Sequence, residues 1–280
     1  TSALKREELL IAGFYGYGNT TQAVGLYSVL VDPFAAQKIQ YREFSSLTQL
    51  ADYMGPKRAA RTIAKEKERK EKGKKPELRL YAQPVRLEER PEGFLLLSEV
   101  YLPAANFNTS PYSHYYPGYY PYGIGSLRRG FYNVPYSANP PMTNPNTEVR
   151  MIETFVTLFD NKGIITFDQS LPMKDVKLPS LEQASDFVIQ KTNVVLAYRK
   201  ESELFIKTGD PETMEFQSDT LKLELKNASD VVYIEHEEDT SIRYWYDNNF
   251  YVSGHHSVKD KKKDGNGIRY VFFVNKVETK

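Results

Sequence analysis

The segment ETFVTLFDNKGIITF, residues 153–167, decides the fold class of this chain. It contains two runs rich in β-branched and aromatic residues, ETFVTLF and GIITF, which meet at Asp160-Asn161-Lys162-Gly163. Two such runs joined by a short glycine-bearing turn are typical of antiparallel strands in a hairpin. The segment therefore predicts an all-β protein built from antiparallel sheets.

Similar runs recur along the chain in four sets, each separated by turns that contain glycine, proline or asparagine. Repeated small sheets of about 40 to 50 residues are the signature of propeller blades, because one small sheet cannot bury both faces alone. We therefore predict a propeller-like stack of about four units in a single domain, residues 1–280. The runs are residues 9–15, 25–32 and 38–44; 94–101, 153–159 and 163–167; 187–190, 193–199, 204–207, 214–216 and 221–225; and 231–234, 242–246, 250–254 and 269–277.

Two insertions interrupt the strand pattern, and the first, residues 46–75, is predicted to be helical and basic. Ser46-Leu47-Thr48-Gln49 has the form of a capping box, Pro56 is suited to the first turn of a second helix, and Gly73 to its end. Residues 57–75 hold ten basic residues and three glutamates. Because charge runs usually face water, this pattern favours a solvated or protein-docking helix over a nucleic-acid or membrane contact.

The second insertion, residues 106–147, holds eight of the 21 tyrosines and seven of the 16 prolines. Proline at this density disfavours regular strand or helix, so the segment is predicted to be a long loop. Tyrosine offers a rigid contact area with a polar tip, which suits protein partners and sugar rings. The predicted partner-binding residues are Tyr112, Tyr115, Tyr116, Tyr119, Tyr120, Tyr122, Arg128 and Arg129.

No catalytic or metal-binding constellation stands out, and no cofactor is predicted. The chain has no cysteine, which excludes disulfides and thiol chemistry. His255 and His256 are adjacent on a predicted strand, so their side chains point to opposite faces and do not share one ion. The acidic run at residues 235–239 is predicted to be a solvated turn, because it lacks the order of ligands in a calcium loop. Whether the chain is an enzyme stays open, with the balance towards no activity.

Several motifs together resemble uncharacterised propeller-like cell-envelope proteins of Gram-negative bacteria. They include IAGFY at residues 11–15, VRLEERPEGFLLLSEVYL at 85–102, FDNKGIITFDQSLP at 159–172 and YWYDNNFYVSGHHSVKD at 244–260. The resemblance implies a location in the periplasm or at the outer membrane. Because members of that family are often longer at the N-terminus, it also implies that the chain is the C-terminal part of a longer protein.

These observations predict a non-enzymatic binding or scaffold protein of the cell envelope that engages a protein partner through residues 106–147. The alternative is a carbohydrate-binding or carbohydrate-active propeller with acidic residues in its central channel. Binding of nucleic acid through residues 57–75 is a third, less favoured interpretation. No transmembrane segment is predicted, since no apolar run approaches the roughly 20 residues that cross a bilayer.

Overall fold

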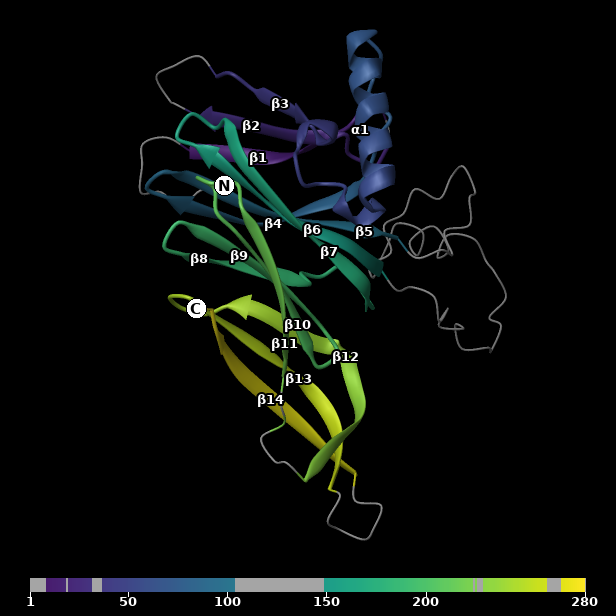
Figure 1. Cartoon of the computed structure of the whole chain (residues 1–280), viewed down its shortest axis with the longest axis vertical. Helices are drawn as coiled ribbons and strands as arrows, with labels where there is room; N and C mark the ends of the chain where they lie inside the picture. The colour runs from purple at the N-terminus through teal and green to yellow at the C-terminus, as the bar shows by residue number, and fades with distance from the viewer. Residues whose placement is uncertain are drawn as a thin grey trace, which may run out of the picture.

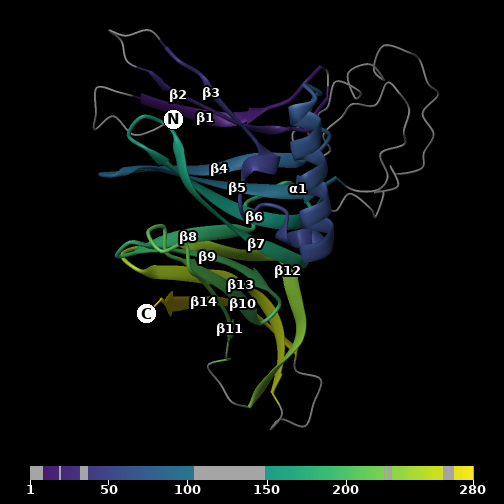
Figure 2. The same cartoon turned by 45° about the horizontal axis from the view of Figure 1, so that its top comes forward.

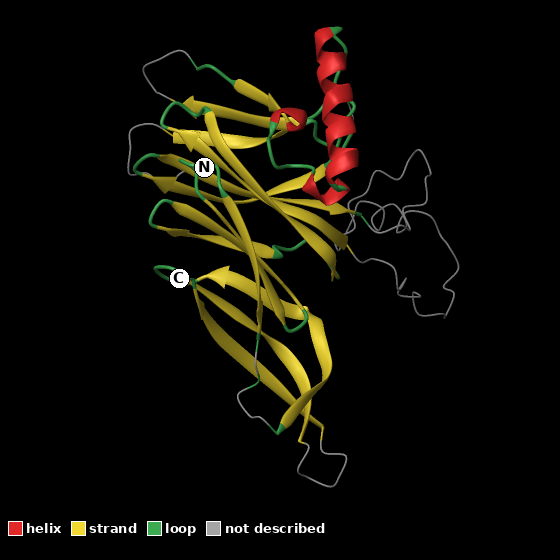
Figure 3. Ribbon diagram, viewed as in Figure 1, coloured by secondary structure: helices red, strands yellow, loops and turns green. Residues whose placement is uncertain are grey.

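The computed structural model describes residues 9–18, 20–31, 37–103, 149–223, 225, 229–260 and 268–279. Strands account for 62% of the structure and helices for 10%. Figure 3 shows this balance, with a long helix beside the strands. The predicted all-β class is confirmed.

Within the described ranges, fourteen strands form four antiparallel sheets, and in each sheet the strands follow one another in chain order. The first sheet contains β1 (Leu9–Tyr15), β2 (Gly25–Val31) and β3 (Gln40–Glu43). The second contains β4 (Tyr81–Arg90), β5 (Gly93–Leu102), β6 (Val149–Asp160) and β7 (Ile165–Leu178). The third contains β8 (Ser185–Gln190), β9 (Asn193–Lys200), β10 (Glu203–Gly209) and β11 (Phe216–Lys222). The last contains β12 (Asp230–Tyr244), β13 (Asn249–Asp260) and β14 (Ile268–Glu278).

The four sheets stack face to face along the longest axis of the molecule, in chain order (Figures 1 and 2). Three apolar layers fill the spaces between neighbouring sheets. Successive side chains of a strand point to opposite faces, so each inner sheet contributes to two layers. On β5, Phe94 and Leu96 pack towards the first sheet, whereas Leu95 and Leu97 pack towards the third. Among the described residues the stack does not close into a ring.

The basic insertion forms one α-helix, α1 (Pro56–Glu71), which begins at the predicted Pro56 and is followed by Gly73 with a φ of 64°. The predicted capping box at residues 46–49 is wrong, because no α-helix begins there. Instead the backbone N–H groups of Thr48 and Gln49 donate to the two carboxylate oxygens of Asp168 on β7, at 2.9 and 2.7 Å. Two short 3-10 helices, η1 (Phe44–Ser46) and η2 (Asp52–Met54), lie on either side of this contact.

The predicted strands are largely confirmed, with three corrections. The separate runs predicted at residues 214–216 and 221–225 are wrong, because one strand, β11, extends from Phe216 to Lys222. β4 was not predicted, since its sequence contains Pro84 and four charged residues, a composition that is poor for a central strand and tolerated at a sheet edge. The last set contains three strands, whereas four were predicted. The runs at residues 231–234 and 242–246 belong to the single strand β12, which continues through the acidic run with a register shift between His236 and Ser241.

None of the helices among the described residues combines the length and the apolar character that crossing a membrane requires.

Candidate functional site

The predicted partner-binding residues, Tyr112 to Arg129, lie outside the described residues. The described part of the chain holds a groove of about 540 Å³ between the first sheet and α1. We call it the tyrosine groove, and it is lined by Tyr15, Gly16, Tyr17, Tyr41, Arg42, Glu43, Ser46 and Lys70.

The groove exists because the middle strand of the first sheet has a glycine between two large side chains. Gly25 on β2 pairs with Tyr15 on β1 and with Glu43 on β3. A Cβ atom on Gly25 would lie 2.7 Å from Cε1 of Tyr15, so only glycine leaves room for that ring. The Tyr15 ring consequently reaches across the sheet and meets the Tyr41 ring edge-on, with 5.0 Å between the ring centroids.

Three rings make the apolar wall of the groove. Tyr17 also meets Tyr15 edge-on, with 6.1 Å between centroids and 86° between the ring planes. Tyr41 is 61% exposed, so its ring is available to a ligand. Edge-to-face pairs of this kind are a preferred arrangement of aromatic rings. The rings therefore hold each other in place as inclined walls around an open space.

The polar groups of the groove carry both signs of charge. Nζ of Lys70 lies 3.4 Å from Oε2 of Glu43, and the hydroxyl of Ser46 donates to the carbonyl oxygen of Glu43 at 2.6 Å. Burial, and then the nearby Tyr17, Glu43 and Tyr41, raise the pKa of Tyr15 to about 12. The Tyr15 hydroxyl therefore stays protonated at neutral pH and keeps a proton that it can donate to a ligand.

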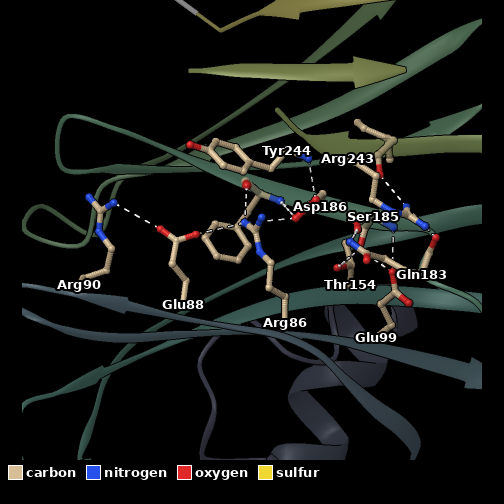
Figure 4. A network of polar contacts seen from close by, with 12 residues as sticks. Arg86, Glu88, Arg90, Glu99, Thr154, Gln183, Ser185, Asp186, Arg243 and Tyr244 are labelled. Carbon is tan, nitrogen blue, oxygen red and sulfur yellow. Dashed lines mark hydrogen bonds and ion pairs between the residues drawn. The ribbon is translucent and has the colours of Figure 1, made fainter. Parts of the chain in front are cut away.

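A second group of polar residues lies where the first strands of three successive sheets meet (Figure 4). Nη2 of Arg86 on β4 donates to the carbonyl oxygen of Phe187 on β8 at 2.7 Å and lies 3.2 Å from Oδ1 of Asp186. The backbone N–H of Tyr244 on β12 donates to Oδ2 of the same carboxylate at 2.7 Å. Asp186 thus connects the second, third and last sheets. We call Arg86, Asp186 and Tyr244 the first-strand network.

Glu99 on β5 is fully buried beside this network. Its Oε1 accepts hydrogen bonds from the backbone N–H groups of Ala184 and Ser185, both at 2.8 Å, and from the Ser185 hydroxyl at 2.7 Å. Gln83 donates to Oε2 at 3.0 Å. Burial raises the pKa of Glu99, although these four donors act in the opposite direction. A carboxylate enclosed by protein donors holds the chain before β8 against the second sheet, which is a structural role.

Neither the tyrosine groove nor the two smaller grooves described below brings two carboxyl groups together as a glycosidase site would require. A glycosidase requires two carboxyl groups facing one another across a substrate. The tyrosine groove has one acidic residue in its lining, Glu43. Two smaller grooves among the described residues have one acidic residue, Glu201, and no acidic residue, respectively.

The side chains of His255 and His256 point to opposite faces of β13, as the strand pattern predicts. His255 stacks on Tyr270 at 4.8 Å on one face of β13, whereas Nε2 of His256 lies 3.1 Å from Nη2 of Arg199 on the other face. The predicted turn at residues 235–239 is wrong, because these residues continue β12. Within the ranges that the structure describes, no three His, Cys, Asp or Glu side chains gather as a metal site would require.

Sequence reasoning missed the tyrosine groove, although one signal was present. Tyr15 lies at the end of β1, Tyr41 lies in β3, and Tyr17 follows β1, and both strands fall within predicted runs. The signal was Gly25, the glycine that faces Tyr15 and Glu43 across the middle strand β2. Comparison of the chain with protein-family models, with curated proteins and with solved structures gives no match.

Proposed function

We propose that this chain is a non-enzymatic binding protein that holds an extended peptide segment of a protein partner in the tyrosine groove. The observation that carries the proposal is the set of three tyrosine rings around an open groove of about 540 Å³, with an ion pair at its rim. Binding grooves are mostly apolar and aromatic, with a few polar groups that fix the orientation of the ligand.

The inclination of the rings favours a peptide over a glycan. Tyr17 and Tyr41 meet Tyr15 at 86° and 73°, so the three rings form walls and not one flat platform. A sugar ring stacks best on a broad flat face. An extended peptide, by contrast, inserts side chains such as proline rings between aromatic walls, which is how aromatic-lined grooves recognise polyproline II segments. Glu43 and Lys70 then offer one acceptor and one donor to the peptide backbone.

The proposal has three further parts, which concern the arrangement of the sheets, the location of the protein and a second contact with the partner. A propeller-like arrangement is supported by the first-strand network, because first strands that meet at one edge are what blades around an axis would have. A location in the cell envelope is supported by the resemblance of the sequence motifs to propeller-like envelope proteins. A second contact through residues 106–147 is supported by their tyrosine and proline content.

Selection from a displayed library of proline-containing peptides, followed by affinity measurement of the selected peptides, tests the groove. We expect Tyr41→Ala to weaken binding of the selected peptides at least about tenfold, since the loss of a central aromatic contact costs more than 1 kcal/mol. Tyr233→Ala is the matched control, because Tyr233 on β12 is also 61% exposed and lies in a different sheet. Equal binding of the peptides to the wild type and to Tyr41→Ala would contradict the proposal. A glycan array is probed in parallel with the wild type and with Tyr41→Ala. If the substitution weakens binding to glycans and leaves binding to peptides unchanged, the carbohydrate alternative is favoured.

A further inference from the structure

The last strand of each sheet lies at one of its two edges, and three of these four edge strands are built to resist pairing with another chain. β3 has only four residues, of which Arg42 and Glu43 are charged. β7 contains Pro172, and Asp168 on the same strand binds residues 48 and 49. β11 is polar over most of its length. Short, charged, proline-bearing or covered strands are the usual means by which proteins protect sheet edges.

β14 carries three charged residues, Arg269, Lys276 and Glu278, but it has none of the other protections. It is eleven residues long, contains no proline and pairs with β13 without a register shift from Ile268 to Glu278. No strand among the described residues lies on its other side. Its alternate residues Ile268, Tyr270, Phe272 and Val274 are 48%, 59%, 62% and 55% exposed. A long, regular and apolar edge strand is a template for a further strand.

The opposite face of β14 is fixed in place. Val277 is 5% exposed, and Phe273 packs with it in the apolar layer between the third and last sheets. The ring of Phe273 lies 4.4 Å from that of His256 on β13. One face of β14 is therefore anchored in the core, and its exposed apolar side chains lie on the opposite face of the last sheet.

The sequence of β14 is compatible with antiparallel pairing to itself. If the two-fold axis passes at Phe272, this residue faces its own counterpart, and Tyr270 faces Val274 of the second copy. The same register places Lys276 opposite Ile268 and Arg269 opposite Asn275, so no like charges face each other. Aromatic and aromatic–β-branched pairs are among the stabilising cross-strand contacts, whereas facing like charges are destabilising.

We propose that β14 pairs with β14 of a second copy, which joins two three-stranded sheets into one continuous antiparallel sheet across a two-fold axis. The interface is isologous, the commonest kind in homodimers. An eleven-residue strand spans roughly 36 Å, which provides a ladder of backbone hydrogen bonds along one straight edge. This interface involves the last sheet only, and it is independent of the tyrosine groove on the first.

Sedimentation velocity at increasing protein concentration tests the pairing through a charge exchange at Phe272. We expect the wild type to show a concentration-dependent dimer. Phe272→Lys and Phe272→Glu each place like charges opposite one another, so each alone should self-associate at least about tenfold more weakly. An equimolar mixture of the two variants should recover a dimer, because opposite charges then face each other.

Tyr233→Lys is the control, since Tyr233 lies on β12, at the other edge of the same sheet, with nearly the same exposure as Phe272. This variant should dimerise as the wild type does. If Phe272→Lys does not fold, judged by circular dichroism, the double variant Tyr270→Lys, Val274→Lys replaces it, because these two positions face each other across the axis, and Tyr270→Glu, Val274→Glu becomes its partner in the mixture. A wild type that stays monomeric at high concentration, variants that dimerise unchanged, or a mixture that stays monomeric would each overturn the proposal.

Discussion

The guanidinium group of Arg86 lies 4.0 Å from the centre of the Phe187 ring, and this contact joins the second sheet to the third. The same guanidinium binds the carboxylate of Asp186, whose side chain is 3% exposed. Arginine is suited to this position because its planar group stacks on a ring while its N–H groups donate in the same plane. One residue thus combines ring packing, an ion pair and a backbone hydrogen bond at the point where three sheets meet.

We expect Arg86→Ala to lower the free energy of unfolding by about 2–3 kcal/mol, because it leaves a buried carboxylate with fewer partners. Arg86→Lys should recover only part of this loss, since an ammonium group does not stack and donate in one plane. Urea denaturation measures both changes.

The control is Arg90→Ala, because Arg90 has nearly the same side-chain exposure, 27% against 24%, and pairs with the more exposed Glu88 and Glu92. Its loss should cost less than about 1 kcal/mol. Equal losses for the two variants would show that the stacking on Phe187 and the bond to Asp186 add nothing.

Glu66 connects α1 to the segment that leads into β4. Although it is a charged helix residue, it is 4% exposed, and its carboxylate accepts from the backbone N–H groups of Glu77 and Leu78 at 3.0 Å. We expect Glu66→Ala to lower the free energy of unfolding by about 2–3 kcal/mol, since hydrogen bonds to a charged acceptor are the strong ones. Glu68→Ala should change stability by less than about 0.5 kcal/mol, because Glu68 is exposed and pairs only with Lys72 along the helix. Similar losses would contradict a tethering role for Glu66.

The strands could be predicted from the sequence wherever apolar runs were bounded by turn residues. β1 begins and ends at the predicted residues, and β5, β6, β9 and β10 each enclose a predicted run. β4 was not predicted because its proline and charged residues are unfavourable in a local strand pattern, although a strand at a sheet edge tolerates them. The acidic run of β12 was predicted as a turn for a related reason. Its strand conformation is imposed by pairing with β13, a long-range contact that local propensity does not contain.

The tyrosine groove was harder to predict than the strands that form it. Its rings come together because Tyr15, Gly25 and Glu43 share one row across three strands, which requires the register of two hairpins. The lysine at its rim comes from α1, and nothing in the local sequence indicates that this helix lies beside the first sheet. Predicting the groove would therefore have required the tertiary arrangement.

Gly25→Ala tests the row that forms the groove. The added Cβ atom would lie 2.2 Å from the carbonyl oxygen of Arg42, a backbone atom that moves only if β3 moves. We expect a loss of about 2–3 kcal/mol in the free energy of unfolding, typical of overpacking, together with weaker peptide binding at the groove. Gly13→Ala is the control, because its Cβ atom would meet only the Tyr27 side chain, at 3.1 Å, and a side chain yields more easily. Equal effects of the two substitutions on stability would contradict the argument.

The last prediction concerns the buried carboxyl group of Glu99. Burial raises its pKa in the folded protein above the value in the unfolded chain, so the folded state holds the proton more tightly. The stabilising contribution of this group is therefore fully present below the unfolded pKa, about 4.3, and is lost as the pH rises through the folded pKa. Glu99→Gln removes the titration while it keeps the shape of the side chain. Its amide oxygen can accept from Ala184 and Ser185, and Gln83 can turn its own amide to accept from the new one.

We expect the free energy of unfolding of Glu99→Gln minus that of the wild type to increase as the pH rises from acid to neutral. Urea denaturation at a series of pH values measures this difference. Glu92→Gln is the control, since Glu92 is 59% exposed and its curve should run parallel to that of the wild type. If the Glu99→Gln curve is also parallel, the four donors around Glu99 offset its burial completely. If the difference instead falls with rising pH, those donors stabilise the charged form, and the direction assigned to the pKa of Glu99 is wrong.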